Sequence, residues 1–156
     1  MNIRLAIPAD AEACWNIRNQ AIRHGCKRSY AAAVIDAWTP DAMPASYRAV
    51  IAANPFFIVE GPDARPAATG YLDLTSGSVE AVFTLPAYTG WGFSSQIINA
   101  IKDEARKRGF KALTLFSTPN AQSFYEKHGF IPIRESLYPS ALARSDLRCM
   151  HMAIKL

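Results

Sequence analysis

The chain has 156 residues, of which 50% are apolar and 19% are charged, and this composition argues against a disordered or low-complexity protein. The length suits one compact domain with its own core, so residues 1–156 are predicted to form a single domain. The formal net charge of +4 comes from residues 101–156, which carry ten Lys/Arg against five Asp/Glu.

The basic excess does not indicate a nucleic-acid partner. Arg106, Lys107, Arg108 and Lys111 hold much of it and close a predicted helix, where cations complement the negative end of the helix dipole, and the sequence has no basic stripe with several interleaved aromatic residues. No apolar run reaches membrane-spanning length, and Arg4, Pro8 and Asp10 interrupt the N-terminal stretch, so we expect a cytoplasmic protein without membrane association. Three widely spaced cysteines without a CxxC pair indicate neither disulfides nor a metal site.

The first third of the chain is predicted to contain one strand and three helices. Residues 2–7 are predicted to be a strand, and residues 10–25 a helix, because apolar residues recur at spacings of three and four before Gly25. Two shorter helices are predicted over 30–38 and 44–54, each ended by a proline or by the residue before it.

The middle of the chain is rich in β-forming residues. Segments 56–60, 67–74 and 79–85 are separated by the turn sequences "GPDARP" and "TSGS", which predicts a three-stranded antiparallel meander. Residues 93–108 then form an amphipathic helix that presents Ile97, Ile98, Ile101 and Ala105 on one side and that ends at Gly109.

The remaining residues add three strands and one helix. Segments 111–117, 131–138 and 148–156 are predicted strands, and "NAQSFYEKHGF" is a helix with Asn120 as its cap and Gly129 at its end. The whole chain is therefore predicted to be an α+β protein with a central sheet of about seven strands flanked by helices.

Gly90 and Gly92 stand between a predicted strand and a predicted helix. Such a turn presents unpaired backbone N–H groups and the positive end of a helix to an anion, and glycine lets a diphosphate come close. The sequence "GWGFSS" is neither a P-loop nor a GxGxxG fingerprint. On these residues alone, a plain turn is an equally good interpretation.

The wider pattern is more specific. Thr84-x-Pro86 is followed by Thr89-Gly90-x-Gly92-x-Ser94 and, about thirty residues later, by "NAQSFYEKHGF". This series resembles the second and third signatures of the GCN5-related N-acetyltransferase (GNAT) family, in its small bacterial form, and the order of elements fits over most of the chain. The resemblance implies a mixed, mostly antiparallel sheet. Thr89 stands where the family usually has Gln or Arg, and Ser94 where it usually has Gly or Ala.

The resemblance also implies acetyl-CoA as cosubstrate. Its diphosphate would meet the turn, and its pantetheine arm would lie along 82–85 as an added strand, with the N–H of Phe83 or Thr84 polarising the thioester carbonyl. Asn120 would contact the pantetheine amides, its other interpretation being the helix cap. The residues expected to bind the coenzyme are Phe83, Thr84, Thr89, Gly90, Trp91, Gly92, Ser94, Ser95 and Asn120.

Tyr125 corresponds to the family's general acid, which protonates the departing thiolate; on the sequence alone it is a core aromatic. Glu80 is the candidate general base, because strand alternation puts Glu80, Val82 and Thr84 on one face, beside the thioester; the alternative is a carboxylate that faces water. Tyr30 and Trp38 are the candidate acceptor-binding residues in the loop and helix after the first long helix.

These residues predict an N-acetyltransferase that moves the acetyl group of acetyl-CoA to a primary amine by direct attack, without a metal. The acceptor would be a small molecule or a peptide of unidentified structure. The alternative is a non-catalytic coenzyme A-binding or protein-interaction domain with the same fold. Exposed sheet edges suggest a homodimer.

Overall fold

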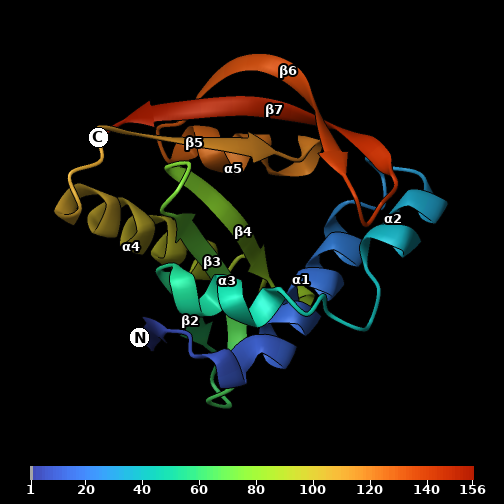
Figure 1. Ribbon diagram of the computed structural model, residues 1–156, viewed down its shortest axis with the longest axis horizontal. Helices are drawn as coiled ribbons and strands as arrows, with labels where there is room; N and C mark the ends of the chain where they lie inside the picture. Colours follow the sequence, from blue (N-terminus) through green and yellow to red (C-terminus); the bar gives the residue numbers. More distant parts are fainter. Residues whose placement is uncertain (1) are drawn as a thin grey trace.

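A computed structural model describes residues 2–156 and shows one seven-stranded sheet with helices on both faces (Figure 1). The strand order is β1-β2-β3-β4-β5-β7-β6, and every neighbouring pair is antiparallel except β4 and β5. The predicted mixed, mostly antiparallel α+β sheet is confirmed. The strands are β1 (Ile3–Leu5), β2 (Phe56–Glu60), β3 (Pro66–Asp73), β4 (Ser78–Thr84), β5 (Ala112–Ser117), β6 (Ile131–Ser140) and β7 (Ser145–Lys155).

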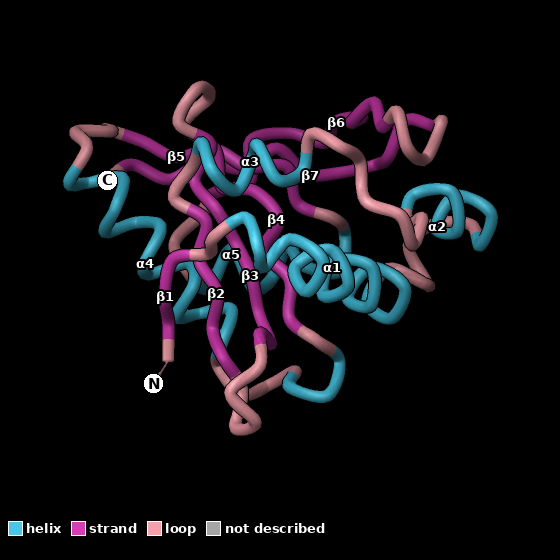
Figure 2. Tube along the Cα trace, turned by 60° about the horizontal axis from the view of Figure 1, so that its bottom comes forward, coloured by secondary structure: helices cyan, strands magenta, loops and turns pink. Residues whose placement is uncertain are grey.

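The helices α1 and α4 lie on opposite sides of strands β2 to β4 (Figures 1 and 2). Because β3 packs against both helices, its residues are buried on both faces of the sheet. No helix of the described residues is long and apolar enough to cross a membrane. The α-helices are α1 (Ala11–Gly25), α2 (Ala32–Trp38), α3 (Tyr47–Ala53), α4 (Phe93–Lys107) and α5 (Gln122–Lys127), and the short 3-10 turns are η1 (Pro8–Asp10), η2 (Pro86–Tyr88) and η3 (Pro119–Ala121).

Helix α4 packs against β3 through the apolar face that the sequence predicts. Ile97, Ile98, Ile101 and Ala105 are all fully buried. The approach of the two elements requires a residue without a side chain at Gly70, because a Cβ there would lie 2.3 Å from Cγ2 of Ile97. This contact fixes the position of α4 and therefore of the glycine turn that precedes it.

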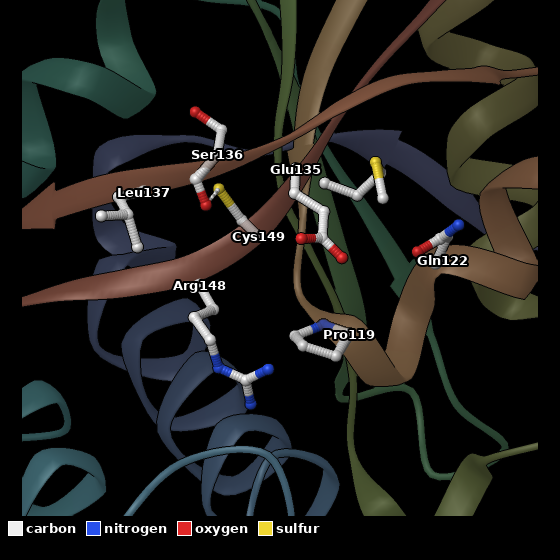
Figure 3. Close-up of a pocket in the computed structure, with 8 residues that line it drawn as sticks. Pro119, Gln122, Glu135, Ser136, Leu137, Arg148 and Cys149 are labelled. Atoms are coloured by element: carbon white, nitrogen blue, oxygen red, sulfur yellow. Dashed lines mark hydrogen bonds between the residues drawn. The ribbon is translucent and has the colours of Figure 1, made fainter.

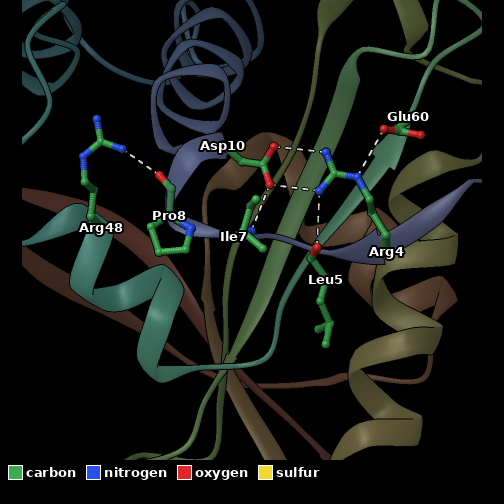
Figure 4. A network of polar contacts seen from close by, with 7 residues as sticks. All are labelled: Arg4, Leu5, Ile7, Pro8, Asp10, Arg48 and Glu60. Atoms are coloured by element: carbon green, nitrogen blue, oxygen red, sulfur yellow. Dashed lines mark hydrogen bonds and ion pairs between the residues drawn. The ribbon is translucent and has the colours of Figure 1, made fainter.

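On the opposite face, α1 and α3 cover β2, and a polar network ties the start of the chain to them (Figure 4). The Arg4 guanidinium donates to the carboxylates of Asp10, at 2.9 and 3.0 Å, and Glu60, at 3.1 Å. The hydrogen bonds from Arg4 hold the pKa of the Asp10 carboxyl below its usual range. Arg48 of α3 donates to the carbonyl oxygen of Pro8 at 2.6 Å. These contacts anchor β1 and the entry to α1.

Strands β4 and β5 separate almost as soon as they meet. They share one parallel bridge, between Ser78 and Thr114, beside which the Thr114 N–H donates to the Gly77 carbonyl oxygen. Beyond this bridge, no strand within residues 2–156 pairs with the edge of β4 that faces β5. The opening created there holds the candidate site.

Candidate active site

Strand β4 carries a β-bulge at Ala81, which decides where its side chains point. Tyr71 pairs with Glu80 and Thr69 pairs with Phe83, so three steps along β4 match two along β3. Ala81 has a φ of 53°, a left-handed conformation that is strained for alanine. The Thr69 hydroxyl donates to the Ala81 carbonyl oxygen at 2.9 Å and so holds the bulge in place.

The bulge overturns the predicted alternation of Glu80, Val82 and Thr84. Val82 packs in the core beneath α4, and the Thr84 hydroxyl lies 2.6 Å from the Ser94 hydroxyl at the start of α4. Glu80 lies on the other face, because its partner Tyr71 stacks on Phe56 on the α1 side of the sheet. The prediction that Glu80 shares a face with Thr84 is therefore wrong, because one extra residue in a strand inverts the alternation beyond it.

A groove follows the separated end of β4, and we call it the splay groove. It encloses about 280 Å³. The Leu85 N–H points toward β3, where it donates to the Ala67 carbonyl oxygen. Because successive N–H groups of a strand point in opposite directions, the N–H of Thr84 points away from β3 and toward the groove. The groove is lined by Ala21, Ile22, His24, Gly25, Cys26, Val82, Phe83, Thr84, Pro86, Thr89, Ser94, Thr118, Asn120, Ala121, Phe124 and Tyr125.

The glycine turn lies at one end of this groove. Gly90 and Gly92 have φ values of 87° and 84°, which favour glycine, and a Cβ added at either would meet nothing within 4 Å. Their N–H groups donate to no acceptor within residues 2–156, whereas the Trp91 N–H is taken by the Tyr88 carbonyl oxygen. The first helical bond of α4 runs from Gln96 to Gly92, so the N–H groups of Phe93, Ser94 and Ser95 precede the ladder. The turn is therefore open, positive and rich in free donors.

The side chains of the turn have varied surroundings. The Ser95 hydroxyl lies 3.0 Å from Nε2 of His128, which joins α4 to the end of α5. Thr89 is exposed, and Trp91 is 55% exposed and packs edge-on against Tyr88, at 5.2 Å between ring centroids.

Asn120 does not cap α5, and that interpretation is wrong. It lies inside η3, the cap position of α5 belongs to Ala121, and no side chain caps that helix. The Asn120 side chain instead faces the end of α1, where its Oδ1 accepts a hydrogen bond from the Cys26 thiol at 3.4 Å. This contact places Asn120 on the wall of the splay groove.

A second hollow, of about 240 Å³, adjoins the splay groove, and we call it the aromatic cavity. The predicted acceptor residues Tyr30 and Trp38 both line it, with their rings 5.7 Å apart and edge-on. The Tyr30 hydroxyl donates to the Arg148 carbonyl oxygen at 2.5 Å, which fixes the loop before α2. The remaining wall consists of Arg18, Ile22, Val79, Glu80, Ala81, Val82, Phe83, Phe116, Ser117, Thr118, Ala121, Tyr125, Tyr138, Leu147 and Cys149.

Glu80 is the one carboxylate in the wall of the aromatic cavity. Burial raises the pKa of Glu80, against the effect of a hydrogen bond that Ser78 Oγ donates at 2.9 Å. Burial raises the pKa of Tyr71, Tyr125 and Tyr138, and the negative charge of Glu80 raises each further. Glu80 thus sits among three tyrosines, where a raised pKa suits a proton acceptor.

Tyr125 lines both hollows and is 8% exposed. Its ring packs between Phe124 and Phe130, while its hydroxyl makes no hydrogen bond to any residue in 2–156. A phenol that is held by its ring and free at its oxygen is able to donate to a ligand that enters between the two hollows.

Arg18 is a cavity residue that our sequence reasoning missed. Its guanidinium lies 4.2 Å from the Trp15 ring centroid and 5.9 Å from that of Trp38, and it donates to Asn19 Oδ1 at 2.7 Å. The available signal was its position, four residues before Ile22, on a face of α1 that is mostly apolar.

A third hollow, of about 530 Å³, lies between β6, β7 and the start of α5 (Figure 3). Glu135, Arg148 and Gln122 project into it, and Cys149 belongs both to it and to the aromatic cavity. None of the residues predicted to bind a ligand lines it.

Comparison with solved structures shows the same fold. The chain superimposes on a GCN5-related N-acetyltransferase of Rhodopseudomonas palustris with a TM-score of 0.89, at 20% identity, over 99% of this chain and 95% of that one. The PaiA N-acetyltransferase of Thermoplasma acidophilum, solved with coenzyme A, gives 0.79 at 17% identity, over 99% and 98%. YncA of Salmonella typhimurium, solved with acetyl-CoA, gives 0.69 at 22% identity, over 100% and 94%.

Sequence comparison gives the family. An uncharacterised acetyltransferase of Streptococcus pyogenes serotype M1 is 34% identical over 93 residues, which span 54% of this chain and 65% of that protein. The profile of the acetyltransferase (GNAT) domain matches residues 26–156, which include β2 to β7, the glycine turn and α5. The chain therefore belongs to the GNAT acetyltransferase domain family.

Proposed function

We propose that this protein is an acetyl-CoA-dependent N-acetyltransferase that acts on a primary amine by direct attack. The observation that carries the proposal is the junction of the two hollows, where the free hydroxyl of Tyr125 and the free edge of β4 meet the wall that holds Glu80. The splay groove would hold the coenzyme and the aromatic cavity the amine. The acetyl-CoA and coenzyme A complexes of YncA and PaiA support this choice of cosubstrate.

Each protein group has one task in the proposed reaction. The N–H groups of the glycine turn bind the diphosphate, and the Thr84 N–H donates to the thioester carbonyl oxygen. Glu80, directly or through water, takes a proton from the ammonium group, and the amine nitrogen then bonds to the carbonyl carbon. As the carbon–sulfur bond breaks, Tyr125 donates its proton to the thiolate, and the nitrogen gives up its second proton, which restores the Tyr125 hydroxyl directly or through water. The products are an amide and free coenzyme A, and Glu80 releases the proton that it took from the ammonium group to solvent.

Calorimetric titration with acetyl-CoA tests the coenzyme site. Gly92→Glu and Gly92→Ala impose the same strain at a φ of 84°, but only the glutamate adds negative charge to the turn. We expect wild type to bind, Gly92→Ala to bind somewhat more weakly, and Gly92→Glu to lose binding through charge repulsion. Equal binding by the two variants would show that the turn does not hold the diphosphate.

Tyr125→Phe tests catalysis in the same preparation. With an amine that wild type acetylates, kcat is expected to fall at least tenfold while the affinity for acetyl-CoA stays the same, because only the hydroxyl is removed. An unchanged kcat would exclude Tyr125 as the acid. Binding of acetyl-CoA without turnover of any amine in a broad screen would favour the non-catalytic coenzyme A-binding domain.

A further inference from the structure

The aromatic cavity contains a cation that has no carboxylate partner. Arg18 is half-buried, and within residues 2–156 it forms no ion pair, although six other arginine–carboxylate pairs are present. Its one hydrogen bond to a side chain goes to the amide oxygen of Asn19. Arg18 therefore differs from Arg4, which is bonded to two carboxylates.

The surroundings of Arg18 hold its charge in place without neutralising it. Burial lowers the pKa of Arg18 to about 10, so the guanidinium remains protonated at neutral pH. Trp15 and Trp38 stabilise the cation through their ring faces, but a guanidinium offers five donors, and an aromatic face satisfies none of them fully. A charge that is partly removed from water in this way is stabilised further by an anion that bonds to it.

The cavity has one charged group of each sign. Arg18 is the one Lys or Arg residue, and Glu80 the one Asp or Glu residue, among the side chains that line it. The two line the same cavity without forming an ion pair within residues 2–156. Arg18 extends from α1 and Glu80 from β4, and the rest of the wall is largely aromatic and apolar.

We propose that Arg18 binds a carboxylate, or another compact anion, of an acceptor whose amine is held at Glu80, so that the substrate is a small amino acid-like zwitterion. This inference rests on the proposed function and names its substrate class. Arg18 presents two parallel N–H groups that match a carboxylate in bidentate geometry. The aromatic wall, with Tyr30 and Trp38, contacts the apolar part of the molecule.

A purely structural role for Arg18 makes a different prediction. If Arg18 only spaces Trp15 from Trp38, its loss disturbs the cavity for every amine alike. If it binds a carboxylate, its loss affects only those amines that carry one. Matched pairs of acceptors separate the two roles.

The experiment measures kcat and KM for L-phenylalanine and L-methionine, each against its carboxamide, at saturating acetyl-CoA. Wild type is expected to prefer the acids by at least tenfold in kcat/KM. Arg18→Met keeps an unbranched apolar stem and removes the guanidinium, and it should remove that preference by raising KM for the acids alone. Arg18→Lys should retain part of it, and Arg106→Gln, at the exposed C-terminal end of α4, should retain all of it.

Calorimetry of the same acids with the protein saturated in coenzyme A provides a readout that does not need turnover. Binding of the acids to wild type but not to Arg18→Met supports the inference. Equal treatment of acids and carboxamides by wild type, or an equal loss for both in Arg18→Met, overturns it. If acetyl-CoA itself fails to bind wild type, the proposed function has failed, whereas coenzyme binding without recognition of the acids refutes this inference alone.

Discussion

Replacement of Gly70 by alanine tests how closely α4 lies on β3. A Cβ at Gly70 would lie 2.3 Å from Ile97 Cγ2, 3.2 Å from Val82 Cγ2 and 3.5 Å from Ile101 Cδ1, and Ile97 is fully buried. The φ of Gly70 is not positive, so the cost arises from crowding. Overpacking of this kind costs about 1–3 kcal/mol, which lowers the melting temperature of a domain of this size by about 2–12 °C.

A double-mutant cycle identifies the atom responsible. Ile97→Ala removes Cγ2 and makes room for the new methyl group, whereas Ile97→Val keeps Cγ2 and serves as the matched control. In denaturant titrations, we expect Gly70→Ala to be nearly neutral in the Ile97→Ala background and to remain costly with Ile97→Val. The same cost in all three backgrounds would refute the argument that the clash with Ile97 sets the distance between α4 and β3.

Two further predictions concern β4. Because burial raises the pKa of Glu80, the folded protein holds the Glu80 proton more tightly than the unfolded chain does, and the free energy of unfolding falls as the pH rises through the raised pKa. Glu80→Gln cannot ionise, so it should melt at a higher temperature than wild type near pH 8 but not near pH 4. The same variant should lose most of kcat. A lower melting temperature near pH 8 would contradict this sign. Thr69→Val leaves the Ala81 carbonyl oxygen without its donor, so stability should fall by about 1–3 kcal/mol and kcat should fall too, whereas Thr69→Ser keeps the bond and most of kcat. Equal kcat values for the two Thr69 variants would show that the hydroxyl does not hold Glu80 in position.

Most of the fold was predictable because its signals are local. The spacing of Ile97, Ile98, Ile101 and Ala105 specifies the buried side of α4, and these residues are buried as predicted. Turns that contain proline and glycine separate the strands of the meander, and β2, β3 and β4 pair in that order. The first strand is shorter than predicted, because pairing with β2 covers only Ile3–Leu5.

The errors at the site have a different origin, because they depend on residues far apart in the sequence. An alanine gives no local sign of a left-handed conformation, and the bulge at Ala81 depends on Thr69 from the neighbouring strand. Asn120 is a good cap by type, but the chain enters α5 through a 3-10 turn that directs its side chain to Cys26. Arg18 can be recognised as a cavity residue only in the folded chain, where α2 places the Trp38 ring near its guanidinium.

The single bridge between Ser78 and Thr114 divides the sheet into two blocks, β1 to β4 and β5 to β7, which meet along an open seam. Each block is hydrogen-bonded within itself, so thermal opening is easiest along the seam. An extended ligand that bonded to β4 there would act as a missing strand and join the blocks. Part of the binding free energy would then hold the two blocks together, and the ligand-free chain would be the more loosely held state at the proposed reaction site.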